Sequence, residues 1–255
     1  MFNLLLDSFK NRRGVYDKKN NIRSNDTVLD TKTFPMLKED IHALVIADTH
    51  DGIAPSDYPI TNNPYDLLIC LGDVSYIDWL EIFNYDKYKC IPVKIGITGN
   101  HYDVDFTEVN KWLLENDETP IIDIHGKIYS MLNSGITFSG IRSSAKYKHK
   151  NNLLTQKEAY GIAEAMSAAD ILLSHSNPKK EFDICDDISP YPHAGLYGVT
   201  HYMEKHEKCK YNLHGPVHDN YVQQHISSAG QTWTEMSFYK MKDINITTNG
   251  IEIIS

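Results

Sequence analysis

The sequence predicts an α/β protein with two β-sheets and helices on the outside. From residue 41 onwards, short and nearly continuous apolar runs alternate with helical patterns, which is typical of strands buried on both faces of a parallel sheet. After residue 220 the pattern changes to short strands joined by short loops, which is typical of antiparallel pairs. The composition, 41% hydrophobic and 23% charged over 255 residues, suits one large domain or two small ones with a sizeable core.

The individual elements can be placed in chain order. Buried strands are expected at the apolar runs 41–47, 67–71, 91–97, 171–173 and 211–213, with a further strand at 136–139. One helix is expected where Phe106, Val109 and Leu113 share a face, and another begins at a capping box of Thr155 and Glu158. A third helix is expected at 196–206, and antiparallel strands of a second sheet or sheet edge are expected at 221–226, 232–239 and 251–254.

Residues 1–40 differ from the rest of the chain. Residues 2–13 could form a short helix, and the stretch that follows is rich in Lys, Asn, Asp and Thr without a clear period. We therefore expect an N-terminal arm at 1–40 and one domain at 41–255. No signal peptide, membrane span or C-x-x-C pair is evident, so a cytoplasmic protein with reduced cysteines is expected.

The charge balance limits the classes of partner. Lys and Arg number 25 against 34 Asp and Glu, which gives a formal net charge of -9. This balance argues against charge-driven binding to nucleic acid or to anionic membranes. Phosphate chemistry on such a protein needs its own local positive charge, and a bound metal is the obvious source.

Polar side chains follow each of the five buried runs, at the point where each strand ends. They are Asp48-Thr49-His50, Gly72-Asp73, Gly99-Asn100-His101, Ser174-His175 and His214-Gly215-Pro216-Val217-His218. Because ligands of open α/β sheets bind outside the carboxyl ends of the strands, we expect these groups to meet in one place. Each motif alone is an ordinary turn or loop, but the ordered set of carboxylate, imidazole and amide groups suits Mn²⁺, Fe or Zn²⁺.

This ordered set resembles the motifs of the calcineurin-like metallophosphoesterases over about residues 41–220. The resemblance implies a β-sandwich flanked by helices, in α/β/β/α layers, and two divalent metal ions. The implied ligands are Asp48, His50, Asp73 and His218 for the first metal, with Asp73 bridging to a second metal held by Asn100 and His175. A metal-bound hydroxide would then attack phosphorus. His101 would lie beside the leaving oxygen as a general acid or charge stabiliser, or it would only fix its loop.

Two positions depart from the family pattern. The last motif usually reads Gly-His-x-His, but here Pro216 replaces the first His, which binds the second metal in the family. Water could fill the vacancy, His214 could take the place, or the second metal could be weak or absent. An acidic residue normally follows Gly-Asn-His, and here it comes one place late, at Asp103, which we keep as a candidate orienter of His101.

Two further residues are candidates for substrate binding. Arg142 follows the strand at 136–139 and could clamp a phosphate oxygen, although a solvated loop arginine is an equal alternative. His193 could line the substrate cleft, with a turn or cap as the alternative. The chain has no Walker-type phosphate loop and no Gly-x-Ser-x-Gly motif, which argues against an NTPase and a serine hydrolase.

The function expected from the sequence is a metal-dependent hydrolysis of a small phosphomonoester or phosphodiester, such as a nucleotide. The alternative is a metal- or nucleotide-binding module that Pro216 has deprived of fast turnover. A nuclease would need a basic groove, which the acidic balance disfavours. The oligomeric state is left open by the sequence.

Overall fold

The computed structural model describes residues 40–50, 52–101, 105–132, 134–148, 152–179, 194–215 and 217–255. The expected N-terminal arm lies outside these residues except for Asp40, and so does the expected helix at 2–13. Among the cysteines, Cys70, Cys90 and Cys209 are free thiols, whereas Cys185 is outside the described part. Within the described ranges no helix has the length and apolar character needed to cross a bilayer.

The first sheet has six strands in the order β12-β11-β1-β2-β3-β4. Their bounds are β1 Ile41–Ala47, β2 Leu67–Cys70, β3 Val93–Gly96, β4 Ile121–Asp123, β11 Lys240–Thr247 and β12 Gly250–Ile253. The strands β1 to β4 run parallel, as their apolar sequences predict, while β11 pairs antiparallel with β1 and β12 antiparallel with β11.

The second sheet also has six strands, in the order β5-β6-β7-β8-β10-β9. Their bounds are β5 Ile128–Ser130, β6 Thr137–Ile141, β7 Ile171–Ser174, β8 Tyr211–His214, β9 Tyr221–Ile226 and β10 Thr232–Ser237. Here β6, β7, β8 and β10 are parallel, and the antiparallel strands β5 and β9 lie at the two edges.

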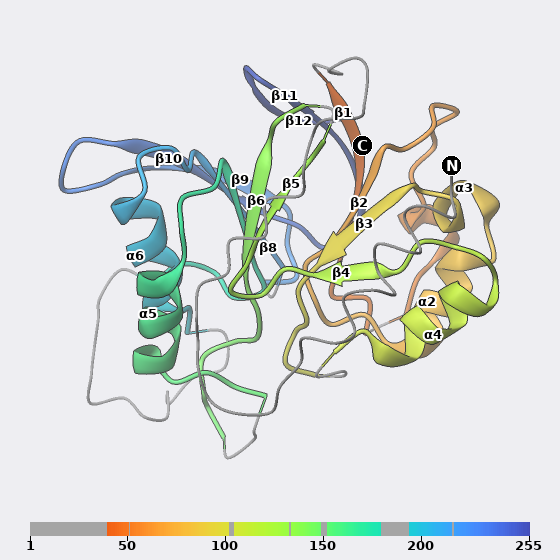
Figure 1. Cartoon of the computed structure of the whole chain (residues 1–255), viewed down its shortest axis with the longest axis horizontal. Coiled ribbons are helices and arrows are strands. Elements are labelled where there is room, and N and C mark those ends of the chain that lie inside the picture. Colours follow the sequence, from red (N-terminus) through yellow and green to blue (C-terminus); the bar gives the residue numbers. More distant parts are fainter. Residues whose placement is uncertain are drawn as a thin grey trace.

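Helices cover the outer faces of both sheets (Figure 1). On the first sheet lie α2 Tyr76–Phe83, α3 Asp86–Lys89 and α4 Thr107–Glu115, and on the second lie α5 Gln156–Ala165 and α6 Tyr197–Lys205. A 3-10 helix, η2, spans Pro55–Asp57. The predicted fold class, two sheets flanked by helices in α/β/β/α layers, is confirmed.

In the described part of the chain, three apolar clusters hold these layers together. The central one lies between the sheets and joins Val45 and Ile69 of the first sheet to Leu173 and Leu213 of the second. The other two lie between each sheet and its own helices. Alternate residues of one strand therefore reach different clusters, which is why the strands read as continuous apolar runs rather than alternating ones.

The C-terminal strands do not stay together as one antiparallel group. Strands β9 and β10 extend the second sheet, whereas β11 and β12 extend the first. The chain crosses between the sheets after Ser237, where Phe238 is buried in the central core. The strand expected at 232–239 is accordingly shorter, and β11 is an additional strand that the sequence pattern did not reveal.

The capping box expected at Thr155 and Glu158 is confirmed at the start of α5. A second capping box, which the sequence reading missed, begins α2: the Ser75 hydroxyl accepts from the Asp78 backbone N–H, and Asp78 accepts from Ser75 in return. This second box lies next to the Asp48-Thr49-His50 loop at the end of β1.

Candidate metal centre

The polar motifs come from both sheets rather than from five neighbouring strands of one. In chain order, the first, second and third polar loops, which carry Asp48, Asp73 and Asn100, follow β1, β2 and β3 in the first sheet. The fourth and fifth, which carry His175 and His218, follow β7 and β8 in the second sheet. Backbone hydrogen bonds connect the loops within each sheet, from the Asp48 N–H to Gly72 O at 3.1 Å and from the Gly215 N–H to His175 O at 3.3 Å. Between the sheets, the Ser143 N–H after β6 donates to Thr98 O after β3 at 2.9 Å. The carboxyl ends of both sheets therefore meet at one edge of the sandwich.

Among the residues that the structure describes, two groups of side chains at this edge have the spacing of metal ligands. The first group is Asp48, His50 and His218, and the second group is Asp48, Asp73 and His175. Within each group the ligand atoms lie within 4.8 Å of one another. Asp48 belongs to both groups, whereas the resemblance had assigned the shared position to Asp73. Carboxylate oxygens and imidazole nitrogens fit Mn²⁺, Fe or Zn²⁺, so the residues present fit a divalent metal.

The second group is buried and closely packed. Asp48 is 1% exposed, Asp73 is 4% exposed and His175 is fully buried. His175 Nε2 lies 3.3 Å from Asp73 Oδ2 and 2.9 Å from Asn100 Oδ1. Two carboxylates held this deeply carry a large desolvation cost, which a cation between them would offset.

The orientation of His175 is that of a metal ligand. Its Nδ1–H donates to the carbonyl of Leu71 at 2.8 Å, which leaves Nε2 directed at Asp73 and Asn100. Metal-binding histidines commonly donate their other ring N–H to a backbone carbonyl in this way, which fixes the tautomer.

Charge couples His175 to Asp73. Burial by itself would raise the pKa of Asp73, but the charge of His175 and the hydrogen bonds that Asp73 accepts hold this pKa well below its usual value. Burial likewise lowers the pKa of His175, and the charge of Asp73 outweighs it and raises this pKa above its usual value. Both groups are thus charged in the metal-free protein, and a metal would replace the proton on His175.

The first group is more open to solvent. The His50 ring is stacked on His101 with centroids 5.0 Å apart, and it is tilted against His218 at 4.7 Å. His218 Nε2 lies 3.6 Å from Asp48 Oδ1, and Tyr239 stacks on the other side of His218 at 5.4 Å. His101 is exposed, while its backbone N–H donates to Asp73 Oδ1 at 2.8 Å. A ring at the surface beside buried carboxylates is placed to meet a substrate.

Two glycines make room for the carboxylates. A Cβ at Gly99 would lie 2.0 Å from Asp73 Oδ1, and a Cβ at Gly215 would lie 2.4 Å from Asp48 Oδ2. No other residue type fits these positions without displacing a candidate ligand. Steric contact with the Asp73 and Asp48 carboxylates therefore explains why Gly99 and Gly215 are glycines.

Three candidate ligands have left-handed backbone conformations. The φ angles of Asp48, Asp73 and His218 are 50°, 54° and 54°. Non-glycine residues in this region are strained, and such strain concentrates at functional sites, where surrounding contacts enforce it.

Polar residues that the sequence reading missed hold the loops in place. Thr49 Oγ1 donates to Asp78 Oδ2 at 2.8 Å, which connects the first polar loop to the capping box of α2. Asn152 Nδ2 donates to Asn100 O at 2.7 Å and so braces the third polar loop. The capping pattern Ser75-x-x-Asp78 could have been found in the sequence, whereas Asn152 carries no local signal.

The remaining candidates are placed as follows. His214 is fully buried and belongs to neither ligand group; its Nε2 lies 2.8 Å from Glu235 Oε1. Arg142 is half-buried and directly follows β6 at the same end of the second sheet, and its backbone N–H donates to His125 Nδ1 at 3.1 Å. Asp103, His193 and Pro216 lie outside the described residues.

No family model matches the chain, and no curated protein matches it. Among solved structures it is similar to a phosphopantetheinyl hydrolase from Mycobacterium tuberculosis, with a TM-score of 0.43 and 14% identity over 79% of this chain and 90% of that one. It is also similar to a Staphylococcus aureus protein provisionally described as a 5′-nucleotidase, in complex with α-ketoglutarate, with a TM-score of 0.41 and 14% identity over 85% of this chain and 53% of that one. Similarities at this level do not identify a function.

Proposed function

We propose that the protein is a metal-dependent hydrolase of small phosphoesters, such as nucleotides. The observation that carries this proposal is the pair of buried aspartates, Asp48 and Asp73, surrounded by histidines at the edge where the two sheets meet. Five motifs that are far apart in the sequence supply this arrangement, and three of its members are held in strained backbone conformations. A structural role alone does not account for this combination.

The chain would hold up to two divalent ions. The first ion would be bound by Asp48, His50 and His218. The second would be bound by Asp73, Asn100 and His175. Asp48 or Asp73 would contribute to both ions. When bound, such ions lower the pKa of coordinated water and neutralise charge on phosphoryl oxygens.

The side chains around the ions would orient and protonate the substrate. The exposed ring of His101 can donate a proton from a ring nitrogen to the leaving oxygen. Burial lowers the pKa of His101, and the neighbouring His50 lowers it further, although the charge of Asp73 acts to raise it. A lowered pKa makes the imidazolium a stronger acid. Arg142 is proposed to bind a phosphoryl oxygen.

The test is a combined measurement of metal content and hydrolysis. The protein is loaded with Mn²⁺, desalted and analysed for metal, and its hydrolysis of p-nitrophenyl phosphate, bis(p-nitrophenyl) phosphate and a panel of nucleotides is followed. We expect bound metal and metal-dependent turnover in the parent; Asp73→Asn, whose fold is checked by circular dichroism, should hold less metal and lose turnover. Asp170→Asn, a carboxylate that pairs with Lys208 at the opposite ends of the strands, is the matched control and should keep both. Hydrolysis that persists in Asp73→Asn would contradict the dinuclear mechanism.

A second candidate function is a binding module with one metal. Pro216 offers no donor, and His214, which could replace the missing ligand, is engaged by Glu235. One Mn²⁺ per chain together with no turnover on any of the phosphoesters would favour this alternative over the hydrolase.

A further inference from the structure

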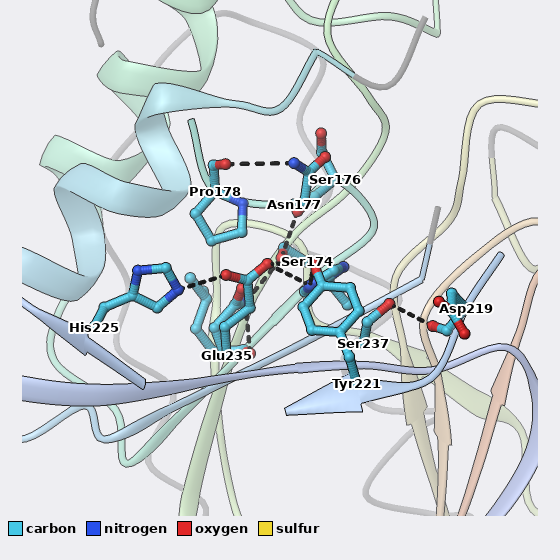
Figure 2. A network of polar contacts seen from close by, with 12 residues as sticks. Ser174, Ser176, Asn177, Pro178, Asp219, Tyr221, His225, Glu235 and Ser237 are labelled. Atoms are coloured by element: carbon cyan, nitrogen blue, oxygen red, sulfur yellow. Dashed lines mark hydrogen bonds and ion pairs between the residues drawn. The ribbon is translucent and has the colours of Figure 1, made fainter. Parts of the chain in front are cut away.

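A single carboxylate holds both ends of the loop that carries His218. This loop connects β8 to β9, is described at residues 215 and 217–220, and is here called the His218 loop. Its first flanking residue is His214, whose Nε2 lies 2.8 Å from Glu235 Oε1. Its last flanking residue is Tyr221, whose hydroxyl donates to the same oxygen at 2.7 Å. Figure 2 shows Glu235 with His225 on one side and Tyr221 on the other.

The contacts of Glu235 are those of an ionised carboxylate accepting from three donors. The third donor is His225, whose Nε2 lies 2.6 Å from Glu235 Oε2. Burial would raise the pKa of Glu235, but the hydrogen bonds from His214 and Tyr221 hold it below its usual value. Burial lowers the pKa of His214, so its ring is neutral and donates through Nε2. The buried Nδ1 of His214 is left without a hydrogen-bond partner, a cost that the contact with Glu235 must offset.

The His218 loop requires such a restraint. His218 has a φ of 54°, a conformation that persists only where surrounding contacts enforce it. Within the loop, Asp219 O accepts from Ser237 Oγ at 2.8 Å, and Asn220 Oδ1 accepts from the Tyr239 N–H at 3.0 Å. These contacts hold the middle of the loop, whereas Glu235 holds its two ends.

We propose that Glu235, through His214 and Tyr221, is a positioning residue that sets the metal affinity of the group formed by Asp48, His50 and His218. This inference deepens the proposed function and rests on its metal centre. Glu235 itself belongs to neither ligand group, so it acts only through the loop. Because His214 is bonded to Glu235, it positions the loop and does not bind the second metal. The ligand position that Pro216 leaves empty must then be filled by another donor.

The test measures Mn²⁺ affinity by titration of the metal-free protein, with free Mn²⁺ followed by electron paramagnetic resonance. Glu235→Ala removes the acceptor of both hydrogen bonds at the loop ends and should weaken the affinity by about 10- to 100-fold, the combined effect of two such losses. Tyr221→Phe removes the hydrogen bond at one end of the loop and should weaken the Mn²⁺ affinity by about 3- to 10-fold. Glu235→Gln keeps an oxygen acceptor and should stay within about threefold of the parent.

The matched control is His225→Phe. His225 contacts the same carboxylate through its other oxygen, but it lies within β9 rather than at an end of the loop, and a phenyl ring can keep its stacking on Trp233. We expect parental Mn²⁺ affinity in this variant. A second readout needs no metal: amide hydrogen exchange over residues 214–221 should be faster in Glu235→Ala and Tyr221→Phe than in His225→Phe.

The outcomes separate this inference from the proposed function. The role of Glu235 would be overturned if Glu235→Ala and Tyr221→Phe both kept the parental Mn²⁺ affinity, or if His225→Phe lost as much affinity as they do. Neither result would affect the proposed function, which depends on hydrolysis by the parent. A parent that binds Mn²⁺ but hydrolyses no phosphoester would refute the proposed function, and the affinity series would still decide on Glu235. If Glu235→Ala fails to fold, the comparison of Mn²⁺ affinity between Tyr221→Phe and His225→Phe tests the inference. Where the parent hydrolyses substrate, saturating Mn²⁺ should restore kcat in Tyr221→Phe, which a general loss of structure would not allow.

Discussion

The substitution Gly99→Ala tests whether the third polar loop is shaped around Asp73. The added Cβ would lie 2.0 Å from Asp73 Oδ1 and 2.5 Å from the Asp73 backbone nitrogen, where real Cβ atoms stay at least 3.0 Å away. The carboxylate must therefore move by about 1 Å, and the backbone contact prevents relief by a side-chain rotation alone. Overpacking of this kind costs about 1–3 kcal/mol in the free energy of unfolding.

Gly99→Ala should lose more Mn²⁺ affinity and hydrolysis than its lower free energy of unfolding would explain. A displacement of ~1 Å in a catalytic group can lower the rate about 100-fold, and metal ligands tolerate only about 0.2 Å. We expect Gly99→Ala to unfold at lower urea concentration, to bind Mn²⁺ weakly and to lose phosphoester hydrolysis. Urea unfolding followed by tryptophan fluorescence, Mn²⁺ titration and steady-state kinetics are the assays.

The control for this experiment is the same change at Gly161. Gly161 lies inside α5, and a Cβ there meets nothing within 4 Å. Gly161→Ala should raise the free energy of unfolding by roughly 0.5–1 kcal/mol, because alanine is the better helix former, and should leave metal binding unchanged. Parental stability and parental Mn²⁺ affinity in Gly99→Ala would refute the steric reasoning.

Two further predictions concern the second metal and the pH dependence. Pro216→His should strengthen binding of a second metal, and unchanged metal content and rate would show that our assignment of this position is wrong. In the metal-free protein, burial lowers the pKa of His175 but Asp73 raises it, to about 9, against about 6.5 in an unfolded chain. The stability from protonated His175 is therefore complete below pH ~6.5 and is lost as the pH rises through about 9, so the urea midpoint should fall over this range. Bound metal should reverse this trend, since metal requires neutral His175; a metal-free midpoint that does not change between pH 6.5 and 9 would contradict the pairing.

The layers of the fold and the groups at the strand ends were predictable, because burial on both faces leaves a continuous apolar run that ends in polar residues. The run before Asp48 and the run before Asp73 are of this kind, and they form β1 and β2. The sequence could not show that the motifs divide between two sheets, since an apolar run looks the same in either. The crossing near Phe238, which sends β11 to the far sheet, depends on packing in the central core and has no local pattern.

The residues that support the site were hidden for a different reason. A lone glutamate in a strand pattern gives no sign of burial, yet the Glu235 side chain is 4% exposed and lies beside His214. Its role depends on strand pairing: β10 lies between β8 and β9, and only this order brings one carboxylate to both ends of the His218 loop. Pairing order across non-consecutive strands is a tertiary property, which local propensity does not encode.

The division of ligands between two sheets has a mechanical consequence. Asp48, His50 and Asp73 belong to the first sheet, whereas His175 and His218 belong to the second. The central apolar core sets the distance between the sheets, and therefore the distance between the two halves of each ligand group. A metal bound to either group links the sheets as well as the loops, because each group contains members from both. Metal binding and the packing of the central core are thus coupled, so that core substitutions at positions such as Leu213, directly before His214 in β8, act on the site through the spacing of the sheets.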